Sequence, residues 1–280
     1  MVESAWSLLP LLLMLLLGVP HGAYDGPLLW RFSPTSAQRL LWLTAYLLLV
    51  LGAFMFWRLQ PEAAFVLFLA LSLIHFGRSD LPATALPGGS AMTIGFGGVF
   101  TLLLPWWHRE AVSGLLDLLQ VPHQRFFEAL SLFLLPLWLL AAGWTCGVLL
   151  RRRQQVGLLT FAGQVLLVLV LPPLWALCGY FCGLHARRHT RWVLVVLQDS
   201  TAVRRQMLAI MAVTLLLALG CLWWLSGQAT LVPALAQTFF AGLFALTLPH
   251  MLLTDWLLPR LLGSGTAATG AYRGAIPHEH

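Results

Sequence analysis

The sequence predicts an all-α protein, a polytopic bundle of about eight transmembrane helices. Hydrophobic residues make up 59% of the 280 residues and charged residues only 9%, whereas soluble domains are about one-quarter charged. Apolar runs recur along the whole chain, and most are long enough to cross the hydrocarbon core of a bilayer. These observations exclude a soluble domain that carries a single membrane anchor.

The predicted spans follow one another with short loops between them. In chain order they are residues 4–19, 38–57, 62–76, 91–107, 128–150, 156–171, 206–226 and 233–257. The first has neither the basic start nor the small-residue cleavage site of a signal peptide, so we expect it to be retained as a span. Together the spans form one transmembrane domain over residues 1–260. Residues 261–280 are rich in Gly, Ala and Thr and are predicted to form a disordered tail.

Two consecutive prolines, Pro172-Pro173, interrupt the apolar sequence that continues from Leu174. The second proline removes a helical hydrogen bond, so the pair predicts two separate helices and not one long helix. The break also matters for the position of His185. A single uninterrupted crossing would place it at the opposite membrane side from His21 and His75.

All sixteen basic residues are arginines, and they lie mainly in the short loops between spans. This is the pattern of topology signals, and it argues against a nucleic-acid partner. By the positive-inside rule, the arginine distribution favours a multi-pass protein of the cell (inner or plasma) membrane with both termini in the cytoplasm. The four cysteines lie within or beside apolar stretches and are expected to be inert.

Four short polar segments interrupt the apolar sequence, and each contains histidine. They are residues 21–25, 75–80, 185–189 and 250–255. Ionisable groups are costly near hydrocarbon, so such residues favour a functional interpretation. Imidazoles contributed by several helices, mostly without nearby cysteine, indicate a shared metal ion.

His185 and His189 are separated by one helical turn, so their rings project from one face and can hold one metal. Ala186 stands where a zinc protease would carry its glutamate base, which argues against a metallopeptidase. The alternative is a pair of interfacial histidines beside lipid headgroups, supported by the neighbouring arginines.

Three of the histidines are followed by an aspartate four or five residues later: His21 by Asp25, His75 by Asp80, and His250 by Asp255. An aspartate can accept the second ring N–H of a metal ligand and so orient it. The alternative roles are a helix cap or an arginine partner, as for Asp80 beside Arg78. His250 lies inside the last span and is expected to contact the metal ligands or the substrate. Structural or surface roles are expected for the other histidines, His108, His123, His278 and His280.

The order and spacing of these motifs resemble those of the Brp/Blh family, the membrane-integral β-carotene 15,15′-dioxygenases of bacteria and archaea. The matching segments are Gly18-x-x-His21-Gly22-x-x-Asp25, His75-Phe76-Gly77-x-x-Asp80, Phe181-x-x-x-His185-x-x-Arg188-His189 and Pro249-His250. The resemblance runs from the first span to the last. Ala186 departs from it, because many relatives are expected to carry a small hydroxyl residue there.

The resemblance implies an oxygenase that uses Fe(2+) and O2 to cleave the central double bond of β-carotene into two molecules of retinal. It also implies that the iron is held by His21, His75, His185 and His189. Asp25, Asp80, His250 and Asp255 would then support the ligands or line the pocket, as would the aromatic residues Tyr24, Phe76 and Phe181. The implied partners are β-carotene, O2 and the lipid bilayer, with a functional link to a retinal-binding rhodopsin. No reducing cosubstrate is required, and the sequence has no nucleotide-binding motif.

Two other interpretations stay open at the level of sequence. A haem- or ion-handling membrane protein without oxygenase activity would also use paired histidines, but it would not need the aspartates. A structural or regulatory partner of a retinal protein would bind no metal and turn over no substrate.

Overall fold

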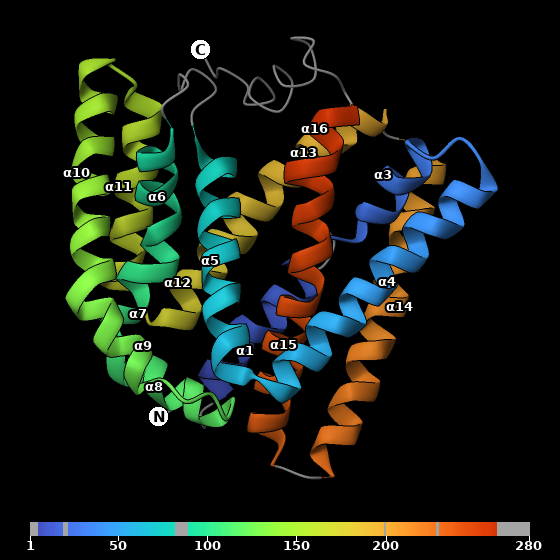
Figure 1. The fold of residues 1–280 in the computed structure, drawn as a ribbon, viewed down its shortest axis with the longest axis horizontal. Coiled ribbons are helices and arrows are strands. Elements are labelled where there is room, and N and C mark those ends of the chain that lie inside the picture. Colours follow the sequence, from blue (N-terminus) through green and yellow to red (C-terminus); the bar gives the residue numbers. More distant parts are fainter. Residues whose placement is uncertain (1–4, 19–21, 82–88, 199, 228–229, 262–280) are drawn as a thin grey trace. The chain divides into compact units, whose positions relative to one another are not determined.

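The computed structural model describes residues 5–18, 22–81, 89–198, 200–227 and 230–261 (Figure 1). Within these ranges all the regular structure is helical, which confirms the predicted all-α class. Six helical stretches are long and apolar enough to cross a membrane: Ser36–Leu59, Pro61–Asp80, Ser90–Trp107, Gln124–Arg151, Thr201–Ser226 and Leu231–Arg260. Leu9–Gly18 and Gln155–Val170 are shorter apolar helices that fall on two further predicted spans. The chain is therefore a helical membrane protein.

The chain divides into two compact units, each assembled from two separate stretches of sequence. The first unit contains Met1–Pro10 and Pro61–His185, and the second contains Leu11–Gln60 and Ala186–His280. Hydropathy gave no indication of this interleaving, because the spans look alike in composition on both sides of each boundary.

The first unit contains most of the central part of the chain. Its helices are α5 (Pro61–Asp80), α6 (Ser90–Gly98), η2 (Val99–Leu103), α7 (Leu104–Trp107), α8 (Arg109–Leu118), α9 (Gln124–Ala129), η3 (Leu130–Leu134), α10 (Leu135–Arg151), α11 (Gln155–Val170), α12 (Pro173–Tyr180) and η4 (Phe181–His185), where η denotes a π-helical segment. Within this unit α5 packs on α6, α6 on α10, and α10 on α11.

Glycines allow α5 and α6 to approach at backbone distance. A methyl group at Gly97 would overlap the carbonyl oxygen of Leu73, and one at Gly77 would overlap the carbonyl oxygen of Thr93. On the other side of α6, the Trp138 indole lies over Gly98 and donates a hydrogen bond of 3.0 Å to the Gly95 carbonyl. Small residues at such contacts are the usual means of close helix packing in membranes. This packing holds α5, and therefore His75, in a fixed position within the unit.

The predicted break at Pro172-Pro173 is confirmed. Helix α11 ends at Val170, and both Leu171 and Pro172 have extended backbone with ψ of 149°. Helix α12 then begins with Pro173 in its first turn, where the missing N–H costs nothing. Helices α11 and α12 pack against each other, so the chain turns at the two prolines on its way to His185.

The second unit combines the two outer parts of the chain. Its helices are η1 (Met14–Gly18), α3 (Asp25–Arg31), α4 (Ser36–Leu59), α13 (Ala186–Leu197), α14 (Thr201–Ser226), α15 (Leu231–Met251), η5 (Leu252–Leu257) and α16 (Leu258–Leu261), while α1 (Ala5–Leu13) crosses the boundary between units. Helix α15 packs against both α4 and α14, with Trp57 against Phe244 at 5.6 Å between ring centroids.

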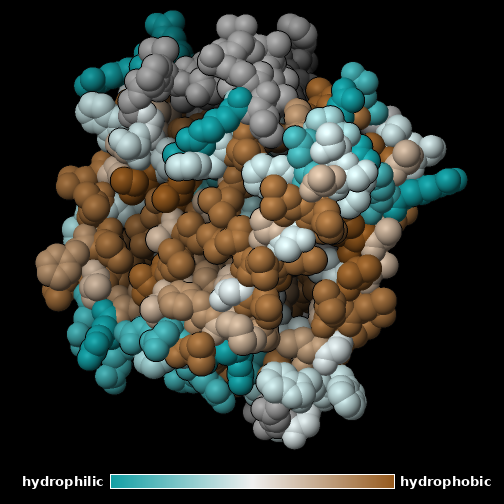
Figure 2. Space-filling model, turned by 45° about the vertical axis from the view of Figure 1, so that its right-hand side comes forward, coloured by the Kyte–Doolittle hydropathy of each residue, from teal (hydrophilic) through white to brown (hydrophobic). Residues whose placement is uncertain are grey.

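Leucine and tryptophan side chains are widely exposed on α4, α10 and α14. Figure 2 shows hydrophobic side chains over most of the face turned to the reader. Trp223 on α14 is 79% exposed and Leu140 on α10 is 74% exposed. Large apolar side chains exposed in this number are suited to lipid and not to water.

Candidate metal centre

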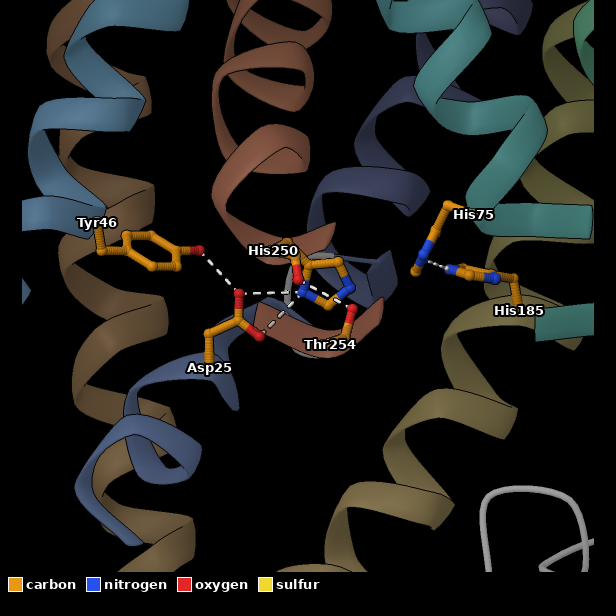
Figure 3. Close-up of polar contacts among 6 residues, drawn as sticks. All are labelled: Asp25, Tyr46, His75, His185, His250 and Thr254. Atoms are coloured by element: carbon orange, nitrogen blue, oxygen red, sulfur yellow. Dashed lines mark hydrogen bonds and ion pairs between the residues drawn. The ribbon is translucent and has the colours of Figure 1, made fainter. Parts of the chain in front are cut away.

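In the first unit the structure brings His75 and His185 together. His75 lies on α5 and His185 is the last residue of η4, and both side chains are buried. Their Nε2 atoms face each other at 3.2 Å (Figure 3). Two imidazole nitrogens that bind one metal at right angles are separated by about 3 Å, given a metal–nitrogen distance of about 2.1 Å. The pair therefore already has the separation that one ion requires of two ligands.

A hydroxyl group orients the His185 ring. The Ser79 hydroxyl donates to the Phe76 carbonyl oxygen at 3.1 Å and lies 3.2 Å from His185 Nδ1. Because its single proton is used on Phe76, the hydroxyl oxygen accepts the Nδ1 proton of His185. The Nε2 atom of His185 then carries a lone pair directed toward His75. This is the tautomer that a metal ligand needs, fixed by an outer hydrogen bond.

Aromatic rings surround His185. Phe181 stacks on the imidazole with centroids 5.7 Å apart, and Phe76 meets its edge at 4.9 Å. Phe76 also contacts Tyr180, which itself stacks on Phe100 at 4.1 Å. Phe76 and Phe181 thus lie beside a candidate ligand, and their predicted role in the pocket stays a prediction. Such an apolar wall excludes water and suits a hydrophobic substrate.

Asp80, one turn beyond Phe76, lies in a buried polar cluster. Its Oδ2 atom accepts hydrogen bonds of 2.7 Å from the Gln164 amide and 2.7 Å from the Tyr180 hydroxyl. All three side chains are buried. The cluster ties the end of α5 to α11 and α12, the two helices that precede His185. Asp80 therefore joins α5 to these two helices, while its predicted support of the metal ligands and its pairing with His75 stay predictions.

Replacement of Asp80 by alanine is expected to destabilise the protein by about 2–6 kcal/mol, because two buried donors lose their acceptor at about 1–3 kcal/mol each. Thermal unfolding of the purified protein in detergent measures this loss. Asp80→Asn is the matched control, since its amide oxygen can still accept both bonds and should retain most of the stability. Equal losses of stability in Asp80→Ala and Asp80→Asn would show that the negative charge of Asp80 stabilises the protein and that its hydrogen bonds do not.

In the second unit the structure brings Asp25, His189 and His250 together. His250 Nδ1 lies 2.9 Å from Asp25 Oδ1 and 3.0 Å from Oδ2, and the Tyr46 hydroxyl donates to Oδ2 at 2.8 Å (Figure 3). The rings of His189 and His250 meet edge to face with centroids 4.9 Å apart. One ligand atom from each of Asp25, His189 and His250 lies within 4.8 Å of the others, and all three residues are buried. This is a candidate metal-binding cluster.

Three other residues were predicted to belong to the site: His21, Tyr24 and Asp255. His21 lies outside the described residues, so its pairing with Asp25 stays a prediction. Tyr24 is buried in the apolar core of the second unit beside Trp192 and Val193. Asp255 is half-buried on η5, and its pairing with His250 stays a prediction. The carboxylate found at His250 Nδ1 is that of Asp25, which is 225 residues away in the sequence.

The histidines that were expected to be structural fit that role where the structure describes them. His108 Nε2 donates to the Val168 carbonyl oxygen at 2.8 Å, in the last turn of α11. Carbonyls in the last turn of a helix lack helical partners, so the imidazole satisfies one of them. His123 lies 3.1 Å from the Val121 carbonyl oxygen in the loop before α9. His278 and His280 lie outside the described residues.

Sequence reasoning missed three residues that bond to the candidate site residues: Ser79, Gln164 and Tyr46. The last two carried a usable signal, because each is a polar group inside an apolar run, and Tyr46 is one of only four tyrosines. Ser79 carried none, since a serine at the end of a span is ordinary. The π-helical segments η4, which ends at His185, and η5, which follows His250, were missed as well. Such segments often mark functional sites.

The residues present fit a bound transition metal. Neutral imidazoles are ligands that Fe, Cu, Ni and Zn all accept. His75 and His185 present Nε2 atoms at ligand spacing, and His250 is hydrogen-bonded to a carboxylate, as metal-binding histidines are.

The chain is similar to known proteins of one family. A family model described as beta-carotene 15,15'-dioxygenase matches residues 12–258. A beta-carotene 15,15'-dioxygenase from uncultured marine bacterium 66A03 is 30% identical over 261 residues, covering 88% of this chain and 92% of the relative. A probable beta-carotene 15,15'-dioxygenase Blh from Halobacterium salinarum is 26% identical over 279 residues, covering 86% and 81%. No solved structure is a significant match. The chain therefore belongs to the beta-carotene 15,15'-dioxygenase family.

Proposed function

We propose that this protein is a β-carotene 15,15′-dioxygenase, which cleaves the central double bond of β-carotene with O2 and releases two molecules of retinal. The observation that carries the proposal is the buried His75–His185 pair, whose Nε2 atoms lie 3.2 Å apart with the His185 tautomer fixed by Ser79. Family membership gives the pair its chemical context.

The proposed cofactor is Fe(2+), held by His21, His75, His185 and His189. His75 and His185 support this by their spacing, and His189 by its place in the second cluster. Imidazole ligands do not select iron by affinity, so the choice of metal rests on the reaction. When bound, iron supplies the redox chemistry by which O2 reacts with an alkene.

The protein contributes orientation and exclusion of water. Both oxygen atoms of O2 enter the two aldehyde groups as the C15=C15′ bond breaks, and the alkene supplies all the electrons. No reductant and no catalytic acid or base is therefore needed. Phe76, Tyr180 and Phe181 give the surroundings of His185 an apolar, aromatic character that matches a polyene.

The haem alternative fits the first unit poorly. Two axial imidazoles bind haem iron from opposite faces of the porphyrin, so their nitrogens must be about 4 Å apart with the ring between them, at about 2 Å per bond. The 3.2 Å between the His75 and His185 nitrogens favours adjacent ligands of one small ion.

Expression of the full chain in cells that accumulate β-carotene tests the function. The expected result is loss of the orange colour and formation of about two retinal molecules for each β-carotene consumed. Purified protein should contain iron and show no Soret band. Unchanged β-carotene in cells whose membranes contain the folded protein would overturn the proposal, and aldehydes of unequal length would overturn the central cleavage position.

Ser79→Ala is expected to lower iron affinity about 10–100-fold, because loss of a group that orients a metal ligand has effects of this size. Competition with a chelator of known affinity measures the change. Ser79→Thr keeps the hydroxyl and should recover most of the affinity. A Ser79→Ala protein with parental affinity would contradict the assignment of the His185 tautomer.

We also propose that the chain lies in the cell (inner or plasma) membrane with both termini in the cytoplasm. Six candidate spans and the positions of the loop arginines support this. Because retinal is the product, a retinal-binding rhodopsin is the proposed consumer.

A further inference from the structure

His250 is placed and oriented as a metal ligand would be. It lies inside α15 directly after Pro249, and its side chain is only 6% exposed. Its Nδ1 atom is 2.9 Å from one oxygen of Asp25 and 3.0 Å from the other. An ionised carboxylate only accepts hydrogen bonds, so Nδ1 is the donor. In the neutral imidazole, the Nε2 atom on the far side of the ring therefore carries the lone pair.

Asp25 is itself held in position. The Tyr46 hydroxyl of α4 donates to its Oδ2 at 2.8 Å, so groups on α4 and α15 both bind the carboxylate of α3 (Figure 3). Asp25 is 2% exposed. A buried carboxylate is costly, and two hydrogen bonds reduce that cost. A chain of Tyr46, Asp25 and His250 that fixes one imidazole tautomer is the arrangement found behind metal-binding histidines.

The ring of His250 lies close to that of His189. The two rings are 4.9 Å apart between centroids and inclined at 66°. Ligand atoms of Asp25, His189 and His250 all lie within 4.8 Å of one another. Nitrogens on one metal are separated by about 3–4 Å, given bonds of about 2.1 Å. An ion bound to His189 is therefore within reach of His250 after a small adjustment of the rings.

We propose that His250 is a further ligand of the metal, bound through Nε2, and that Asp25 and Tyr46 are the residues that position it. The inference rests on the proposed function in one respect, namely that His189 holds a metal. The competing explanation is a buried His250–Asp25 ion pair that only stabilises the fold.

Cobalt(II) substitution of the purified full-length protein separates the two explanations, because cobalt reports its own ligands by visible absorption. Affinity is measured by chelator competition, and the spectrum is recorded at saturating cobalt. His250→Ala should lower cobalt affinity by more than about 10-fold and shift the visible bands. Asp25→Asn should lower affinity with a smaller band shift, and Tyr46→Phe should have the smallest effect. His108→Ala, which alters a histidine bonded to a backbone carbonyl, should leave both readouts unchanged.

His250→Cys adds a test that depends on a new spectral band and not on a loss of cobalt affinity. A thiolate at this position should give a sulfur-to-cobalt charge-transfer band in the near ultraviolet, which the parent lacks. A monodisperse His250→Ala protein with parental affinity and spectrum would overturn the proposal. If His250→Ala does not fold, parental affinity in Asp25→Asn together with no new band in His250→Cys would do the same. A parent that binds no cobalt would overturn both this inference and the metal assignment, whereas β-carotene cleavage by that parent would still support the proposed activity.

Discussion

Replacement of His185 by alanine is expected to abolish retinal formation, with a fall of more than about 100-fold in cells that accumulate β-carotene. The expected loss exceeds that of an outer hydrogen-bonding group, about 10–100-fold, because the variant removes a proposed ligand. His185 faces His75 at 3.2 Å and is 1% exposed, so no neighbouring water can easily replace it. Retinal is measured by chromatography of cell extracts, and iron is measured in the purified protein.

His123→Ala is the matched control for this loss. His123 is hydrogen-bonded to the backbone carbonyl of Val121 in the loop before α9 and belongs to neither cluster. The His123→Ala protein should retain the iron content and the β-carotene turnover of the parent. A His185→Ala protein that is present in membranes at the parental level, contains as much iron and cleaves as much β-carotene would exclude His185 as a ligand.

Gly97→Ala is expected to cause the largest loss of stability among single methyl additions to the described glycines. The new methyl would overlap the backbone carbonyl of Leu73, and backbone cannot move aside as a side chain can. Overpacking typically costs about 1–3 kcal/mol, and a backbone clash is expected at or above the upper limit. Because α5 carries His75, displacement of α5 should also lower iron content. Thermal unfolding in detergent and iron analysis measure the two effects.

Gly143→Ala provides the control in the same unit. Gly143 lies on α10 at an exposed position, and nothing lies within 4 Å of an added methyl. Alanine is favoured over glycine inside a helix by about 1 kcal/mol, so this variant should be neutral or slightly stabilised. Both substitutions replace glycine by alanine, but their effects on stability are expected to have opposite signs. Parental stability in Gly97→Ala would mean that α5 and α6 are not in backbone contact.

The spans and the proline break could be predicted from the sequence because each depends on local chemistry. Hydrocarbon requires long apolar helices, and Pro173 can only begin a helix or break one. The division into two interleaved units could not be predicted in this way. It depends on which apolar helix packs on which, and leucine-rich surfaces carry little information about their partners.

The histidines of the candidate site could be singled out from the sequence, but the groups that bond to them could not. His75, His185, His189 and His250 stand out because ionisable residues are rare in spans. Their hydrogen-bonding partners follow from tertiary structure. Asp25 bonds to His250 across 225 residues, whereas sequence proximity pointed to Asp255. The π-helical segment before His185 was equally inaccessible, since no residue pattern specifies an i→i+5 hydrogen bond.

The separation of Asp25 from His250 also affects how the protein is made. At about 5–20 residues per second, roughly 10–45 s of translation pass between the two residues. During that time the ribosome produces the whole of Pro61–His185, so the first unit is complete while the second still lacks its carboxyl-terminal helices. Asp25 must meanwhile remain where its charge is hydrated, at the membrane surface or in the translocon. Its burial is therefore among the last steps of synthesis, and a chain truncated before His250 should be recognised by quality-control proteases as an inserted chain with an unburied carboxylate.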